Sequence, residues 1–247
     1  MMIDLHSHVL HEVDDGSDSL EMSIEMLRLA CDTGIRAVVA TPHILDGFHS
    51  DYEELVMRKF RELCKTIIDY KLDVDVYLGS EIHFQYGIED IIESSMGSYR
   101  GMGKYFLIET PLTNYPNRFE EALFRIIARG KNPIFAHPER INPLIGNVTT
   151  IERLADNGVL IQVNSGSVLG RFGSKVYNFA ISLLDKGLVH FIASDAHSSR
   201  QRTFNLIRAW KVIVELYGED VAEKLFYTNP MHVLFSERVE RVKPPER

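Results

Sequence analysis

Short apolar runs alternate with longer amphipathic stretches along the whole chain. The runs cover residues 3–5, 36–41, 74–78, 105–109, 133–137, 160–164 and 190–194. Apolar runs of this length between helical stretches are typical of parallel strands that are buried on both faces. The intervening stretches carry apolar residues at helical spacing, as in the stripe Leu20, Ile24, Leu27 and Cys31. The pattern therefore predicts strands and helices in alternation.

Capping signals set the expected helix starts. Asp18 with Glu21 predicts one cap, and Ser50 with Glu53 predicts a second. Further helices are expected from about residues 88, 117, 149, 174, 202 and 220. Seven strand–helix repeats predict an α/β fold, a (β/α)7 TIM-like barrel rather than an eightfold one. The chain of 247 residues fits one such domain, expected over residues 1–242 and followed by a disordered tail at 243–247.

Metal-competent side chains directly follow six of the apolar runs. His6 and His8 are two residues apart, as are Asp195 and His197, so each pair faces one side of an extended segment. Because the carboxyl ends of parallel strands form the active face of a barrel, all of these side chains are expected in one pocket. The set comprises His6, His8, His43, Glu81, Glu109, His137, Asp195 and His197, together with a carboxylate of the Asp14-Asp15-Gly16 loop.

The ligand chemistry narrows the choice of metal. Imidazole and carboxylate groups without thiolate suit manganese, iron or zinc. One ion needs three or four protein ligands, so the nine candidates suffice for two or three ions that share bridging carboxylates. Paired ions clamp the attacking and leaving oxygens of an in-line displacement and generate hydroxide near neutral pH. The sequence therefore predicts an enzyme, with phosphoester hydrolysis as the usual use of such a site.

Composition excludes several other classes of protein. The formal net charge of −8 argues against a nucleic-acid partner, because such domains usually carry a basic face. We expect no signal peptide, no membrane-spanning segment and a cytoplasmic location with reduced thiols. The residues six positions after Cys31 and Cys64 are Ala37 and Tyr70. Neither cysteine therefore has the arginine that a cysteine-dependent tyrosine phosphatase requires.

The ordered motifs resemble those of the polymerase-and-histidinol-phosphatase (PHP) family. Within that family the chain is most similar to the bacterial manganese-dependent protein-tyrosine phosphatases of capsular and exopolysaccharide operons. The resemblance covers nearly the whole chain. It rests on Asp4-Leu5-His6-Ser7-His8, Asp15-Gly16, Thr41-Pro42-His43, Gly79-Ser80-Glu81, Glu109, Ala136-His137-Pro138-Glu139-Arg140, Gln162-Val163-Asn164, Ala193-Ser194-Asp195-Ala196-His197 and Asn229-Pro230.

The resemblance implies a distorted (β/α)7 barrel with a trinuclear site in which manganese is the expected metal and iron or zinc the alternatives. By that analogy three groups of ligands each hold one ion. The loop carboxylate is expected from Asp15, and Asp14 could replace it because the loop length varies in the family. The groups are His6, His8, Glu81 and Asp195; then Glu81, Glu109 and His137; and then Asp15, His43 and His197.

Two arginines are expected to bind the substrate phosphate. Arg140 follows the His137 strand end, and Arg202 lies shortly after His197. A guanidinium can bind phosphate oxygens through two parallel hydrogen bonds. Arg200 is a competitor for Arg202, because the family arginine is usually followed by proline and Thr203 stands here instead.

The expected reaction is attack of a metal-bridging hydroxide on phosphotyrosine, with Asp195 and His197 as candidate proton donors through water. The expected partner is a phosphorylated protein, the tail of a bacterial tyrosine kinase that controls polysaccharide synthesis.

One alternative function is that of a small-molecule phosphatase, such as a histidinol-phosphate phosphatase, that uses the same site. A second alternative is a metal-bound regulatory module without turnover, which the intact ligand set disfavours. His83, two residues after Glu81, could line the pocket rim.

Overall fold

The computed structural model describes residues 1–45, 49–93 and 97–245. Its strands are β1 (Met2–Ser7), β2 (Ile35–Ala40), β3 (His43–Ile44), β4 (Asp75–Leu78), β5 (Glu81–His83), β6 (Tyr105–Glu109), β7 (Asn132–Ala136), β8 (Leu160–Asn164) and β9 (Phe191–Ala193). Its α-helices are α1 (Leu20–Asp32), α2 (Ser50–Asp69), α3 (Ile88–Ile91), α4 (Phe119–Ala128), α5 (Val148–Asp156), α6 (Ser165–Val168), α7 (Ser174–Asp185), α8 (Leu206–Tyr217), α9 (Glu219–Glu223) and α10 (Asn229–Leu234).

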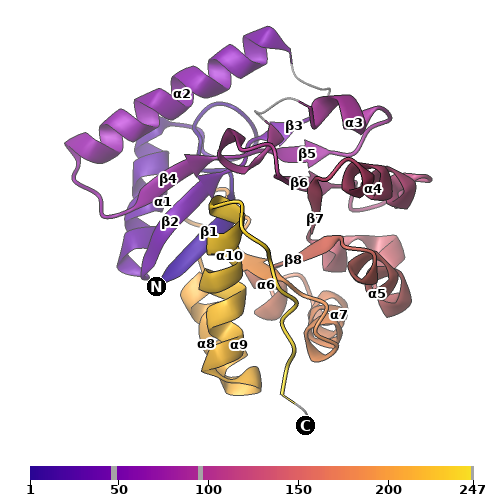
Figure 1. Ribbon diagram of the computed structural model, residues 1–247. Helices are drawn as coiled ribbons and strands as arrows, with labels where there is room; N and C mark the ends of the chain where they lie inside the picture. Colours follow the sequence, from indigo (N-terminus) through magenta and orange to yellow (C-terminus); the bar gives the residue numbers. More distant parts are fainter. Residues whose placement is uncertain (46–48, 94–96, 246–247) are drawn as a thin grey trace.

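All strand pairs in the described sheets are parallel, which confirms the predicted α/β class. One sheet has the order β1-β2-β4 and the other the order β3-β5-β6-β7-β8-β9. Backbone hydrogen bonds between the two neighbouring segments continue through the short breaks that separate β2 from β3 and β4 from β5. The Gly79 amide donates to the Ala40 carbonyl at 2.9 Å, and the Glu81 amide donates to the Pro42 carbonyl at 3.1 Å. Figure 1 shows α1, α2, α4, α5 and α7 on the outer side of the strands, whereas α10 lies beside β1.

The first and last strand runs are also joined through their backbones. The Asp195 amide donates to the His6 carbonyl at 2.9 Å, and the His8 amide donates to the Ala196 carbonyl at 2.8 Å. These hydrogen bonds bring the carboxyl end of β1 beside the segment that follows β9. As a result, residues that are 188 and 189 positions apart in the sequence share one edge of the sheets.

Both faces of β1, β2, β6, β7, β8 and β9 are largely buried, which explains why the sequence shows continuous apolar runs rather than alternation. In β6, Phe106 and Ile108 belong to the larger hydrophobic cluster, which also contains apolar residues of the surrounding helices. The alternate residues Tyr105 and Leu107 belong to a smaller cluster that draws on β1, β2, β7, β8 and β9. Val233 and Leu234 of α10 pack in this smaller cluster against the strand residues.

Several predicted boundaries were wrong by a few residues. Helix α1 begins at Leu20, and Ser19 rather than Asp18 caps it by accepting from the Met22 amide at 3.2 Å. Helix α2 begins at Ser50 itself, with His49 in the cap position. The helix expected from about residue 202 begins at Leu206, because residues 198–205 form a loop without helical hydrogen bonds. The predicted disordered tail falls partly on residues 246 and 247, outside the described residues.

Within the described part of the chain, no helix is long and apolar enough to cross a membrane.

Candidate metal centre

The predicted side chains converge at the carboxyl ends of the strands. His6 lies near the end of β1, Glu81 at the start of β5 and Glu109 at the last residue of β6. His137 directly follows β7, and Asp195 lies two residues after the end of β9. Three groups of these side chains each offer ligand atoms within 4.8 Å of one another. The groups are His6, His8 and Glu81; His43, Glu81 and Glu109; and His8, Asp15, His43 and His197.

The first group surrounds one oxygen of Glu81. Glu81 Oε2 lies 3.0 Å from His6 Nε2 and 3.1 Å from His8 Nε2. Asp195 Oδ1 lies 3.6 Å from each of the same two nitrogens. The four predicted ligands of one ion therefore face a common point, and all four side chains are buried.

The second group shares Glu81 with the first, and the predicted ligand His137 lies beside it. His137 Nε2 lies 2.9 Å from Glu81 Oε1 and 3.9 Å from Glu109 Oε2. His43 Nδ1 lies 3.0 Å from Glu109 Oε1 and 3.3 Å from Glu81 Oε2. His43 thus belongs to the second group through Nδ1 and to the third group through Nε2, which the sequence did not indicate. His137, the predicted ligand of the second ion, lies beside the second group instead of within it.

The third group contains the more exposed of two neighbouring aspartates. Asp15 Oδ1 lies 3.5 Å from His43 Nε2 and 3.4 Å from His197 Nε2, and 65% of the Asp15 side chain is exposed. Asp14 is only 6% exposed, and its Oδ2 lies 2.8 Å from His8 Nδ1. The structure therefore directs Asp15 toward two imidazoles, whereas Asp14 orients the His8 ring from behind.

Paired charges compensate for the burial of this cluster. Burial favours the neutral acid, but His6, His137 and His8 hold the pKa of Glu81 well below its ordinary value. Burial likewise disfavours the charged imidazole of His8, but Asp14 and Glu81 raise its pKa well above the usual range. Burial and the neighbouring His8 lower the pKa of His197 to about 4. The His197 ring is therefore neutral at pH 7, as a metal ligand requires.

The two predicted arginines meet at a single oxygen of Asp195. Arg140 Nη1 and Arg202 Nη2 each donate to Asp195 Oδ2 at 2.8 Å. The Arg140 guanidinium also lies 4.3 Å from the ring centroid of Phe172, in a cation–π contact. Asp195 therefore presents one oxygen to the histidines and the other to the arginines. Arg200 is exposed on the same loop as Arg202.

The sequence placed His83 only at the rim of the pocket and gave no indication of Tyr52. His83 Nδ1 lies 3.2 Å from Glu109 Oε1, so His83 contacts a candidate ligand instead of only lining the rim. The Tyr52 hydroxyl donates to the His43 carbonyl at 2.5 Å. Tyr52 lies in helix α2 and carries no local pattern that could have revealed this contact, because it depends on how α2 packs over the strand ends.

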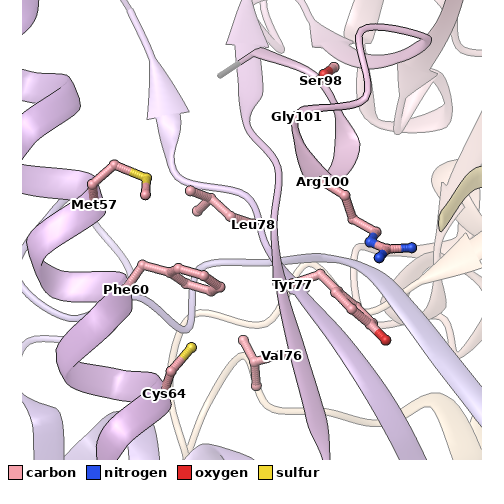
Figure 2. A pocket seen from close by; sticks show the side chains of 9 residues that line it. All are labelled: Met57, Phe60, Cys64, Val76, Tyr77, Leu78, Ser98, Arg100 and Gly101. Atoms are coloured by element: carbon pink, nitrogen blue, oxygen red, sulfur yellow. The ribbon is translucent and has the colours of Figure 1, made fainter. Parts of the chain in front are cut away.

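Two cavities differ in their relation to the cluster. A groove of about 580 Å³ adjoins His43 and Glu109, and its walls include Val13, Leu45, Pro111 and Leu112. A second cavity, of about 430 Å³, lies between α2 and β4 and contains no candidate ligand. Figure 2 shows Met57, Phe60 and Cys64 of α2 facing β4 across this second cavity. Burial raises the pKa of both cysteine thiols, Cys31 and Cys64, which disfavours the reactive thiolate.

Residues 2–235 match the protein family described as capsular polysaccharide synthesis, CpsB/CapC. The chain belongs to this family. It is 32% identical over 246 residues to the tyrosine-protein phosphatase YwqE of Bacillus subtilis, covering 99% of this chain and 96% of YwqE. It is 30% identical over 246 residues to the tyrosine-protein phosphatase CpsB of Streptococcus pneumoniae, covering 96% of this chain and 100% of CpsB.

Solved structures agree with the family assignment. The structure superposes with a TM-score of 0.88 on one from a study of YwqE and CpsB, described there as unique metal-dependent tyrosine phosphatases, with 30% identity and full coverage of both chains. A histidinol phosphate phosphatase of Lactococcus lactis, complexed with zinc, superposes with a TM-score of 0.54 at 14% identity, covering 87% of this chain and 94% of that one. The second likeness concerns the fold alone.

Proposed function

We propose that this chain is a metal-dependent protein-tyrosine phosphatase. The observation that carries the proposal is the convergence of imidazole and carboxylate groups around Glu81, next to two arginines that share Asp195. The donors are nitrogen and oxygen only, which suits manganese, with iron and zinc as alternatives. The family relatives are named tyrosine-protein phosphatases, and the intact set of candidate ligands supports the same activity here.

The fold that carries the site is, in our proposal, the distorted (β/α)7 TIM-like barrel. The two parallel sheets continue into one another at the breaks, and backbone hydrogen bonds join β1 to the segment after β9. Both features support closure of the seven strand runs into one ring. Closure would place all the candidate ligands on the carboxyl-terminal face, where such barrels carry their active sites.

The residues divide into three ligand groups. We assign His6, His8, Glu81 and Asp195 to one ion, Glu81, Glu109 and His137 to a second, and Asp15, His43 and His197 to a third. Divalent cations held by these residues would supply an activated water and neutralise charge on the phosphoryl oxygens. The low pKa values of Asp195 and His197 favour ligand roles for both over the proton-donor roles expected from the sequence.

The arginines and the groove account for binding of the substrate. Arg140 and Arg202 can exchange their contact with Asp195 for the oxygens of a phosphoryl group, which a planar guanidinium binds through two hydrogen bonds. The adjoining groove offers Leu45 and Leu112 as apolar walls beside Glu109. An aromatic leaving group suits such walls, because a tyrosyl ring buries a large apolar surface.

We further propose that the substrate is a phosphotyrosine-bearing protein, the tail of a tyrosine kinase in polysaccharide synthesis. The family description names capsular polysaccharide synthesis, which supports this partner. The expected cytoplasmic location agrees with the two cysteines, both of which are free thiols.

The test is hydrolysis of a phosphotyrosine peptide before and after exhaustive chelation, with manganese, iron and zinc added back separately. Activity should disappear on chelation and return with a divalent ion, with histidinol phosphate a much poorer substrate. A Cys31→Ser, Cys64→Ser double variant is the matched control and should remain active. Full activity in the chelated protein would contradict metal dependence. Loss of activity in the folded double variant would favour a cysteine mechanism.

A further inference from the structure

Strand β8 reaches the same edge as the ligand-bearing strands but carries no histidine or carboxylate. Its last residues include two amides, Gln162 and Asn164, which are 1% and 0% exposed. Both lie on the same face of the strand, because they are two residues apart. Buried amides are costly unless they are hydrogen-bonded, so the partners of these two side chains indicate their purpose.

The two amides link two candidate ligands of the first ion. His6 Nδ1 lies 3.0 Å from Gln162 Oε1. Gln162 Nε2 donates to Asn164 Oδ1 at 2.8 Å, and Asn164 Nδ2 donates to Asp195 Oδ2 at 2.7 Å. The chain of hydrogen bonds therefore runs from an imidazole on β1, through β8, to a carboxylate after β9.

The direction of this chain follows from the chemistry of its last member. An ionised carboxylate only accepts hydrogen bonds, so Asn164 must turn its NH2 group toward Asp195. Its carbonyl oxygen then accepts from Gln162, which leaves the Gln162 oxygen facing His6. Nδ1 of His6 must consequently carry a proton, which leaves Nε2, 3.0 Å from Glu81 Oε2, as the nitrogen that can bind a metal. This is the tautomer that a metal-binding imidazole needs.

The backbone of β8 is itself fixed at this point. The Asn164 amide N–H donates to Glu139 Oε1 at 2.9 Å, and the Ser167 hydroxyl donates to the same oxygen at 2.6 Å. The His137 amide donates to the Gln162 carbonyl at 2.8 Å. Buried contacts therefore hold Asn164 through its backbone as well as its side chain, and the hydrogen-bonded amides have a rigid support.

We propose that Gln162 and Asn164 are positioning residues that fix the tautomer of His6 and the orientation of Asp195 for metal binding. This inference rests on the proposed function, because it assigns the two amides to the first ion of that site. Residues that hydrogen-bond to a metal ligand on the side away from the metal typically contribute about 10- to 100-fold to metal affinity. We therefore expect the effect chiefly in the affinity for metal and only weakly in the KM for substrate.

The experiment measures manganese affinity by competition with a chromophoric chelator, alongside kcat and KM on a phosphotyrosine peptide. Gln162→Met, which removes both hydrogen bonds at similar size, should weaken manganese binding about 10- to 100-fold. Excess manganese should restore much of kcat, and KM should stay near the wild-type value. Gln162→Glu keeps an acceptor for His6 Nδ1 and should retain more of the affinity than Gln162→Met. Asn164→Ala removes the donor to Asp195 and provides a second test should Gln162→Met fail to fold.

Asn229→Ala is the matched control for losing a buried amide. Asn229 is 2% exposed and donates to the carbonyls of His190 and Glu240, neither of which is a candidate ligand. It should lower thermal stability and leave manganese affinity unchanged. Wild-type manganese affinity in folded Gln162→Met and Asn164→Ala would overturn the inference while leaving the proposed function intact. Absence of metal dependence in the wild-type protein would instead contradict the proposed function.

Discussion

Replacing Arg140 with alanine should slow phosphate-ester hydrolysis by roughly 30- to 1,000-fold, because a charge-assisted donor in a water-poor site is worth about 2–4 kcal/mol in the transition state. The Arg140 side chain is only 14% exposed, so solvent screens its charge weakly. After its removal, Asp195 Oδ2 still accepts from Asn164 and Arg202. The variant should therefore keep its metal content while it loses catalytic rate.

Alanine variants of two other arginines provide comparisons for the rate loss expected in Arg140→Ala. Arg202 is 38% exposed, and solvent screening should reduce the cost of Arg202→Ala to roughly 5- to 30-fold. Arg200→Ala serves as the surface control and should behave like the wild type. Arg140→Lys should restore only part of the rate, since an ammonium group cannot reproduce the two-pronged hydrogen bonding of a guanidinium.

The assay combines steady-state rates on a phosphotyrosine peptide, inhibition by inorganic phosphate and the metal stoichiometry of each purified variant. Wild-type kinetics and wild-type phosphate inhibition in Arg140→Ala would show that the phosphate pocket lies elsewhere. Loss of metal from that variant would mean that Arg140 instead braces the ligands. A larger effect of Arg200→Ala than of Arg202→Ala would reverse the assignment of the second phosphate-binding arginine.

Two further perturbations separate catalysis from stability. Glu109→Ala and His137→Ala should each lower kcat by orders of magnitude with an unchanged far-UV circular dichroism spectrum; unchanged activity in both would refute their assignment to the second ion. Burial lowers the pKa of His190 from 6.5 to about 4, so the unfolded chain binds a proton that the folded protein excludes. The free energy of unfolding should fall by about 3 kcal/mol as the pH drops from above 6.5 to below about 4. His190→Asn keeps an acceptor for the Ile161 amide, and on acidification its urea midpoint should fall less than that of the wild type. An equal fall in the two proteins would show that other groups cause the acid sensitivity.

The order of strands was readable from the sequence because burial on both faces leaves an uninterrupted apolar run. The bounds 105–109 and 160–164 agree with β6 and β8. The short strands β3 and β5 were not predicted. Pro42 and Gly79 each suggest the end of a strand. Only the pairing of β3 with β5 shows that strand hydrogen bonding starts again after each of them.

The site was predictable to the extent that its residues follow strands. Ligand-type side chains follow six of the seven strand runs, all except β8, and the topology brings these ends together. The side-chain contacts that hold the candidate ligands in place could not be predicted, because they join residues that are far apart in the sequence. His6 and Gln162 are separated by 156 positions, and neither residue indicates the other. Even Asp14, adjacent to Asp15, could be distinguished from it only by burial and by the contact with His8.

Removal of metal should leave the protein folded but less stable. Glu81 contacts His6, His8, His43 and His137, and Asp195 contacts two arginines, so each of these buried carboxylates has charged or hydrogen-bonding partners without a cation. A site of this kind differs from small zinc domains, whose folding depends on the ion. Added manganese should raise the melting temperature in a concentration-dependent way, because binding to the folded state alone contributes about 2.7 kcal/mol at a hundredfold excess over Kd. Thermal scans and far-UV circular dichroism of chelated and manganese-loaded protein provide the measurement. Loss of the far-UV signal on chelation would show that the histidine and arginine partners do not compensate for the buried carboxylates.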